Sequence, residues 1–214
     1  MARYRHTKIG VSIMEVDADG APTLIITGKM RETALFGHCF EIERKIVIPA
    51  GGARITVRDV VRNLTPKPEP VLFLYHINFE FPFLDEDLAL EFPEGEVRGR
   101  TDLARKRIAD YAKITPPIDG EPEVVYFHLP KERDVRVSLE NKRLGLRAAI
   151  GYDSEQLPVL AQWKSMCSSD YALGIEPETS FIRGRRDELE NGYDSKIPAF
   201  GQVEFGFCVE LSEI

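Results

Sequence analysis

HCFEIERKIVIP, residues 38–49, is the stretch that decides the fold class, because its apolar and polar side chains alternate with a period of two. One parity is apolar over most of its length and includes a single arginine, Arg44, whereas the other carries charged residues in succession. A half-buried β-strand has this period. A Pro-Ala-Gly-Gly turn follows at residues 49–52, and residues 53–64 form a second stretch rich in Ile and Val. The two stretches therefore predict a β-hairpin.

The rest of the chain repeats this pattern of short apolar stretches between Gly- and Pro-rich turns. Further strands are predicted at residues 23–28, 71–79, 124–129, 135–140, 145–152, 160–166, 171–175 and 203–211. Only residues 101–113 are predicted to be helical, with Thr101 and Asp102 capping the first turn. The apolar residues expected to face inward are Leu103, Ile108 and Tyr111. Many short strands with one short helix predict an all-β, antiparallel β-sandwich.

Length and composition favour one globular domain. Sandwiches commonly reach about 200–250 residues as a single domain, and no repeat or linker interrupts the chain, so residues 1–214 are expected to form one. The formal net charge is −7, which argues against a nucleic-acid partner because nucleic acid requires a concentrated basic face. No stretch approaches the ~18 apolar residues of a membrane span, so no membrane partner is expected.

The cysteines and the N-terminus bear on the compartment. Cys39, Cys167 and Cys208 are an odd number without CxxC spacing, so neither a disulfide framework nor a zinc site is expected. Each lies in an apolar context typical of a small buried hydrophobe. Residues 1–10 contain no apolar run of signal length. A reducing cytoplasm is therefore the expected location.

His76 and Asn78 lie two residues apart in Leu74-Tyr75-His76-Ile77-Asn78-Phe79. Side chains two apart on a strand share a face, so both can point into one concavity. An imidazole with the ordinary pKa of ~6.5 can exchange a proton at neutral pH and suits general acid–base catalysis. A core histidine bonded to backbone is the alternative that the motif alone leaves open.

Glu176 ends the apolar stretch Leu173-Gly174-Ile175 and is followed at once by Pro177. The proline restricts Glu176 to extended geometry. A carboxyl beside apolar neighbours can have its pKa raised and serve as a base. A surface glutamate is the alternative, and Glu178 is expected to be the solvated member of the two.

Other candidates are ligand-binding side chains. Trp163 can provide a flat surface for the C–H face of a sugar, or lie in the core. Lys164 can bind a hydroxyl or an anion, or point to water. Asp85 and Glu86 can bind sugar hydroxyls or form an exposed acidic turn, and His38 can face the same cavity. The histidines lack metal-site spacing, so no metal is expected.

The motifs together resemble one family. Tyr75-His76-Ile77-Asn78-Phe79 is similar to the strand that carries the catalytic histidine of galactose mutarotases. Gly174-Ile175-Glu176-Pro177 is similar to the later strand end that carries their catalytic glutamate. A closer resemblance is to an uncharacterised branch of the aldose 1-epimerase superfamily. Its Arg-Glu-x-x-x-Phe-Gly, Tyr-His-x-Asn-Phe-Gly-x-Pro-Leu-Leu-Asp-Glu and Trp-Lys…Glu-Pro segments correspond to residues 31–37, 75–86 and 163–177.

The resemblance covers the chain from about Gly28 onward and has departures. Glu80 stands where the branch has glycine, and residues 167–170 replace a more glycine-rich turn. The N-terminal segment from which mutarotases draw substrate-anchoring Arg and His residues has no counterpart here. The resemblance therefore implies a galactose mutarotase-like supersandwich that is N-terminally shortened, either as the C-terminal part of a longer protein or as a naturally shortened one. Shortening exposes strand edges or an apolar face that another molecule must cover, so a homo-oligomer is a possible assembly.

The resemblance implies an isomerase that interconverts the anomers of a monosaccharide without a cofactor. Glu176 takes the proton of the C1 hydroxyl while His76 protonates the ring oxygen, with Trp163, Asn78, Asp85, Glu86 and Lys164 as substrate contacts. Two other functions stay open. One is a non-catalytic carbohydrate-binding module. The other is an isomerase for a modified or acidic sugar, for which Lys164 and Arg31 are the candidate cations.

Overall fold

The computed structural model describes residues 3–16, 22–192 and 195–214, with side chains from Pro22 onward. The chain divides into two compact units. The first comprises residues 1–71 and 194–210, and the second comprises residues 72–193 and 211–214. None of the helices in these described ranges is long and apolar enough to cross a membrane. The expectation of one domain over residues 1–214 stays a prediction.

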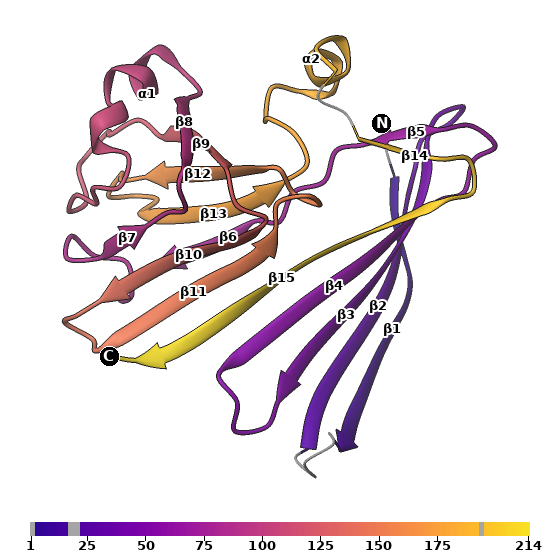
Figure 1. Cartoon of the computed structure of the whole chain (residues 1–214), viewed down its shortest axis with the longest axis horizontal. Coiled ribbons are helices and arrows are strands. Elements are labelled where there is room, and N and C mark those ends of the chain that lie inside the picture. The colour runs from indigo at the N-terminus through magenta and orange to yellow at the C-terminus, as the bar shows by residue number, and fades with distance from the viewer. Residues whose placement is uncertain (1–2, 17–21, 193–194) are drawn as a thin grey trace. The chain divides into compact units, whose positions relative to one another are not determined.

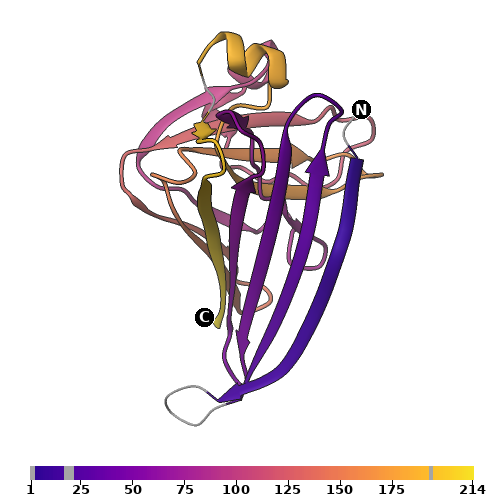
Figure 2. The same ribbon diagram turned by 90° about the vertical axis from the view of Figure 1, so that its right-hand side faces the viewer.

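The first unit is an antiparallel sheet of long strands in the order β1-β2-β3-β4-β15 (Figure 2). Its strands are β1 (Arg3–Val16), β2 (Pro22–Thr33), β3 (Cys39–Pro49), β4 (Arg54–Asn63) and β15 (Gln202–Glu213), the last of which ends in the second unit. A short pair, β5 (Glu69–Val71) and β14 (Ser195–Ile197), completes this unit. The predicted hairpin of β3 and β4 is thus present.

Arg44, the one charged residue on the apolar parity of β3, pairs across the hairpin with Asp59. The register places the two residues directly opposite each other. The guanidinium donates from Nε to Oδ1 at 2.8 Å and from Nη2 to Oδ2 at 2.7 Å. Because the Asp59 side chain is fully buried, the arginine compensates a carboxylate that would otherwise be costly to remove from water.

The second unit contains a five-stranded antiparallel sheet in the order β6-β13-β12-β9-β8 (Figure 1). These strands are β6 (Ile77–Glu80), β8 (Gly95–Gly99), β9 (Val124–Pro130), β12 (Val159–Ser165) and β13 (Ala172–Glu178). Strands β7 (Ala89–Glu91), β10 (Asp134–Asn141) and β11 (Leu146–Asp153) form a second antiparallel group in this unit.

Alternation sends the side chains of the five-stranded sheet to two different faces. Ile175 and Leu173 on β13 are fully buried on one face. On the other face, Val125, Phe127, Val159, Ala161 and Phe181 form an apolar cluster against which Trp163 packs. The second face, called the cluster face below, carries the candidate active site.

Two short helices lie in the second unit, α1 (Asp102–Lys106) and α2 (Arg185–Glu190), and a 3₁₀ turn follows α1 at Ile108–Asp110. The hydroxyl of Thr101 accepts from the N–H of Ala104 at 3.2 Å, as its predicted capping role requires. The predicted inward residues do pack against the core of Ala104, Val124 and Tyr126; they are Leu103, Ile108 and Tyr111.

The all-β, antiparallel prediction is confirmed, and its details require several corrections. The predicted helix at 101–113 is only five residues long, and α2 was not predicted because its residues are almost all charged. The predicted strand 71–79 is interrupted between Val71 and Ile77. Strands β1, β7, β8 and β14 were not predicted. The three cysteines are free and partly exposed, so the expectation that each is a small buried hydrophobe is wrong.

Replacing Arg44 with Met is expected to lower the free energy of unfolding by about 2 kcal/mol, because the buried Asp59 carboxylate loses a bidentate partner. The estimate is below that for a fully buried pair, since the Arg44 side chain is nearly half exposed. Arg58→Met, which removes an exposed charge from the same strand pair, is the control and should cost less than about 0.5 kcal/mol. Urea unfolding measures both, and equal losses would contradict the assignment.

Candidate active site

His76 and Glu176 stand opposite each other on neighbouring antiparallel segments. Strand β6 pairs with β13 in a register that continues back to an isolated bridge between Leu74 and Glu178. The same register places His76 directly across from Glu176. Directly opposed side chains lie on one face, with Cβ atoms about 4.5–5.5 Å apart. The fold thus brings together two residues that are distant in the sequence.

Pro177 determines how closely this pair approaches. The N–H of Tyr75 donates to the carbonyl of Pro177 at 3.0 Å, but proline has no N–H with which to return the bond. Regular pairing consequently begins at Ile77, and this is why the predicted long strand is interrupted. Since Tyr75 and Pro177 occupy the hydrogen-bonded position of the ladder, the next pair occupies the position where side chains come closest.

The contact joins a solvent-facing imidazole to a buried carboxyl. Nε2 of His76 lies 3.0 Å from Oε1 of Glu176, and the two side chains are 48% and 3% exposed. Burial raises the pKa of Glu176, His76 and Arg100 lower it, and Glu123 raises it; the net direction is upward. A carboxylate with a raised pKa is a stronger base than an ordinary surface glutamate.

Oε1 of Glu176 is positioned to accept a further hydrogen bond. The atom is buried and has no partner of hydrogen-bond geometry among the described residues, so the 3.0 Å contact with His76 has the distance of an ion pair without the alignment of a hydrogen bond. A buried acceptor left in this state costs about 1–3 kcal/mol. A hydroxyl donor supplied by a ligand would remove that cost.

Gly174 provides the space that the Glu176 carboxyl occupies. A Cβ atom at position 174 would collide with Oε1 of Glu176 and would lie 3.3 Å from Cβ of Trp163. The glutamate side chain therefore folds back along its own strand over the glycine. A glycine two residues before the carboxylate is the sequence signal for this arrangement.

Trp163 lies beside the pair on the neighbouring strand. Its ring is 5.8 Å from that of His76 between centroids, at an interplanar angle of 65°, and Nε1 donates to Oε2 of Glu123 at 2.7 Å. Trp163 and Asn78 also line a cavity of about 440 Å³ together with Glu80, Phe81, Ser169, Asp170, Tyr171 and Ala172. The tryptophan thus connects the histidine–glutamate pair to a polar cavity.

Glu178 is buried, contrary to the expectation that it is the solvated glutamate. Strand β13 continues through Pro177 to Glu178, whose residue exposure is 3%. Burial raises the pKa of Glu178 to about 9, with further increases from Glu176 and Glu188 and a decrease from Arg100. The acid is therefore mostly neutral at pH 7.

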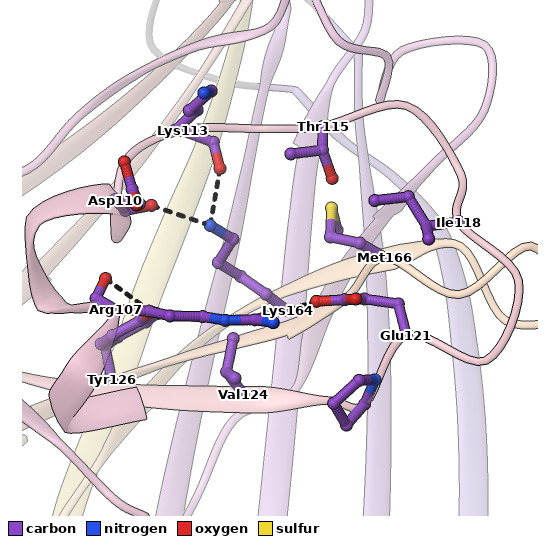
Figure 3. Close-up of a pocket in the computed structure, with 11 residues that line it drawn as sticks. Arg107, Asp110, Lys113, Thr115, Ile118, Glu121, Val124, Tyr126, Lys164 and Met166 are labelled. Atoms are coloured by element: carbon purple, nitrogen blue, oxygen red, sulfur yellow. Dashed lines mark hydrogen bonds and ion pairs between the residues drawn. The ribbon is translucent and has the colours of Figure 1, made fainter. Parts of the chain in front are cut away.

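Lys164 lies on the opposite face of β12 from Trp163, because adjacent residues of a strand alternate. Its Nζ donates to the carbonyls of Asp110, Tyr111 and Lys113 at 3.1, 3.1 and 2.6 Å, beside a separate cavity of about 280 Å³ (Figure 3). Burial lowers its pKa to about 8. The structure does not bring Lys164 to the histidine–glutamate pair. Its three hydrogen bonds hold the segment after α1 against β12.

The remaining candidates have partners of their own. Asp85 is buried and accepts from Nε of Arg143 at 2.8 Å, whereas Glu86 is exposed. Arg31 and His38 belong to the first unit, where Arg31 pairs with Glu41 and His38 pairs with Glu32. Within the second unit, the structure gathers His76, Glu176, Asn78 and Trp163 on the cluster face.

Sequence reasoning missed several residues near the pair. No pattern in the sequence singles out Glu123. It lies one residue before β9, and the pairing of β9 with β12 brings it to Trp163. Arg98 and Arg100 alternate along β8 and its extension, a period-two signal that the short strand concealed. Glu178 is buried because β13 continues through Pro177, whereas proline usually marks the end of a strand.

The fold of this protein is that of a galactose mutarotase-like β-sandwich, as the resemblance predicts. The chain belongs to the family described as Domain of unknown function (DUF4432), whose model matches residues 6–211. No curated protein matches the chain.

Solved structures show the same fold at low sequence identity. A candidate aldose 1-epimerase from Klebsiella pneumoniae subsp. pneumoniae has a TM-score of 0.86 and 22% identity, over 94% of this chain and 53% of that one. A galactose mutarotase-like protein from Clostridium acetobutylicum has a TM-score of 0.65 and 12% identity, over 99% of this chain and 67% of that one. The GalM/aldose epimerase homologue from C. elegans has a TM-score of 0.58 and 12% identity, over 95% and 69%. This chain spans about half the length of the Klebsiella protein.

Replacing Glu178 with Gln is expected to make the free energy of unfolding less dependent on pH. A carboxyl whose pKa rises from about 4.5 unfolded to about 9 folded binds a proton more tightly in the folded state. Its contribution to stability is complete below pH 4.5 and is lost as the pH rises toward 9. Wild type should lose on the order of 1–3 kcal/mol between pH 5 and 8 relative to the variant.

Urea unfolding at pH 5 and pH 8 measures this difference. Glu132→Gln neutralises an exposed carboxyl of the same unit and should leave the pH dependence as in wild type. Parallel pH profiles for wild type and Glu178→Gln would show that Glu178 is ionised in the folded protein at neutral pH.

Proposed function

We propose that this protein is an aldose 1-epimerase that interconverts sugar anomers by general acid–base catalysis, with Glu176 as base and His76 as acid. The observation that carries the proposal is the 3.0 Å contact between Nε2 of His76 and a buried carboxyl oxygen of Glu176. Such a pair offers a proton acceptor and a proton donor side by side. The similarity to candidate and homologous epimerases supports it through the fold.

The proximity of the two groups suits the chemistry of an anomeric centre. The C1 hydroxyl oxygen and the ring oxygen are bonded to the same carbon, so an acid and a base must reach two neighbouring atoms. Glu176 takes the proton of the C1 hydroxyl while His76 gives a proton to the ring oxygen. The C1–ring oxygen bond breaks, the aldehyde forms, and rotation about C1–C2 followed by reclosure returns both protons.

The rest of the cluster face supplies binding contacts. Trp163 gives an aromatic surface for the C–H face of a pyranose, and Asn78 supplies amide groups for hydroxyls in the cavity that the two residues share. The transfer of two protons needs no cofactor. Lys164 is not part of this proposal because its contacts lie on the other face of β12. Asp85 and Glu86 are not part of it because they do not line that cavity.

We also propose a cytoplasmic location, which the three free cysteines support, because thiols persist in reducing compartments. A homo-oligomer stays a prediction.

A carbohydrate-binding module without catalysis is the second candidate function. The buried Oε1 of Glu176, which has no hydrogen-bond partner among the described residues, would serve such a module equally well as an acceptor for a sugar hydroxyl.

Anomer exchange measured by NMR saturation transfer tests the function directly. Purified protein is expected to accelerate exchange of at least one aldose over the spontaneous rate. Glu176→Gln and His76→Asn should each lower kcat/KM by roughly 10²–10⁴-fold, the usual contribution of one acid or base. Glu132→Gln serves as the control. Sugar binding without exchange would establish the module instead, and neither binding nor exchange would contradict both functions.

Gly174→Ala is expected to reduce exchange without unfolding the protein. The new methyl group must displace the Glu176 carboxyl, which is the flexible end of a side chain and can move. A displaced base should lower kcat/KM about tenfold or more, while the melting temperature changes by only a few degrees. Gly28→Ala, where a Cβ meets nothing within 4 Å, is the matched control. Full activity with a displaced carboxyl would exclude Glu176 as the base.

A further inference from the structure

A third cavity in the second unit is rich in arginine. It encloses about 790 Å³ at the β8 edge of the five-stranded sheet. Four of the residues that line it are arginines: Arg98, Arg100, Arg105 and Arg183. Phe127 and Ile182 supply an apolar part of the lining. Neither the acid–base pair nor the cavity beside Trp163 uses these residues.

Two of the arginines that line this cavity lie on the cluster face of the sheet. Arg98 pairs with Phe127, and the N–H of Arg100 donates to the carbonyl of Val125 at 2.9 Å. Alternation therefore places Arg98 and Arg100 on the same face as Phe127 and Val125, which belong to the apolar cluster that Trp163 packs against. Arg100 also acts electrostatically on Glu176.

Several of the arginines are held in place by contacts within the second unit. Arg98 makes a bidentate pair with Glu96 at 2.7 and 2.6 Å. Arg105 pairs with Asp102 at 2.5 Å and donates to the carbonyls of Gly99 and Arg100 at 3.3 and 3.2 Å. Held guanidinium groups lose less conformational freedom when they bind an anion.

Arg183 is positioned by a buried carboxylate. Glu188, almost fully buried, accepts from the backbone N–H of Phe181 at 3.2 Å and of Arg183 at 3.0 Å. The Arg183 guanidinium lies over the Phe181 ring, 4.8 Å from its centroid, and Phe181 packs against Phe127 at 5.0 Å. The short polar helix α2 therefore serves to fix this arginine at the cavity.

We propose that the cavity binds an oxyanion carried by the substrate, so that the sugar whose anomers exchange is an anionic aldose, bearing a phosphate or a carboxylate. The inference rests on the proposed function. Guanidinium groups bind such oxyanions through paired, charge-assisted hydrogen bonds. The sequence offers Lys164 and Arg31 as cations for an acidic sugar. Lys164 faces the other side of β12, and Arg31 belongs to the first unit. We therefore assign the binding of the anion to the arginines at the β8 edge.

The test compares anomer exchange of glucose 6-phosphate, glucuronate and glucose by NMR saturation transfer. At least one anionic sugar is expected to have a kcat/KM about tenfold or more above that of glucose, the effect of one or two charge-assisted contacts. Arg183→Gln and Arg100→Gln should each lower this ratio by about tenfold. Arg133→Gln, which removes an exposed arginine paired with Asp153 elsewhere in the unit, should leave the ratio unchanged.

A second measurement separates this inference from the proposed function. Inorganic phosphate should raise the melting temperature of the wild type, and Arg183→Gln should abolish the shift. Exchange of glucose at a rate equal to that of both anionic sugars would overturn the anion site while the epimerase stands. A phosphate-dependent shift without exchange of any sugar would support the site and overturn the epimerase. The absence of both would overturn both.

Discussion

The site depends on one pairing, the register between residues 74–80 and β13. This register sets His76 opposite Glu176. Pro177 has no N–H to donate, but its carbonyl accepts from the N–H of Tyr75, so the two segments remain paired beside His76 although regular pairing begins only at Ile77. A shift of one residue would send one member of the pair to the other face of the sheet. The acid–base geometry is consequently a property of the ladder and needs no specialised loop.

Burial raises the pKa of both glutamates on this face of β13, but their electrostatic neighbours differ. Glu176 is next to His76 and within the field of Arg100, and both favour its ionised form. Glu178, two residues later on the same face, also has Arg100 as a favourable neighbour, but Glu176 and Glu188 oppose its ionisation and burial raises its pKa to about 9. Two acids separated by a single proline thus differ in their neighbours, because Glu176 lies beside a histidine.

The sequence predicts the fold class, and its motifs single out His76 and Glu176, which the structure brings into contact, but it does not predict their surroundings. Strong two-residue periods located β3 and β4, and short motifs identified His76 and Glu176. The contact of Trp163 with Glu123 depends on which strands are neighbours in the sheet, and the alternation of residues along a single strand does not predict this order. Lys164 was misplaced for a simpler reason. It is adjacent to Trp163 in sequence, and adjacency on a strand means opposite faces.

Glu188 has a consequence for how substrate preference can change. Glu176, the proposed base, lies within β13. The segment that presents Arg183 begins only after β13 ends, and Glu188 fixes it by accepting two backbone hydrogen bonds. Substitutions within residues 181–190 can therefore alter which substituent is accepted while the proton-transfer pair keeps its geometry. On this assignment, the region after β13 is where relatives with different sugar preferences should diverge first, and where engineering of specificity should begin.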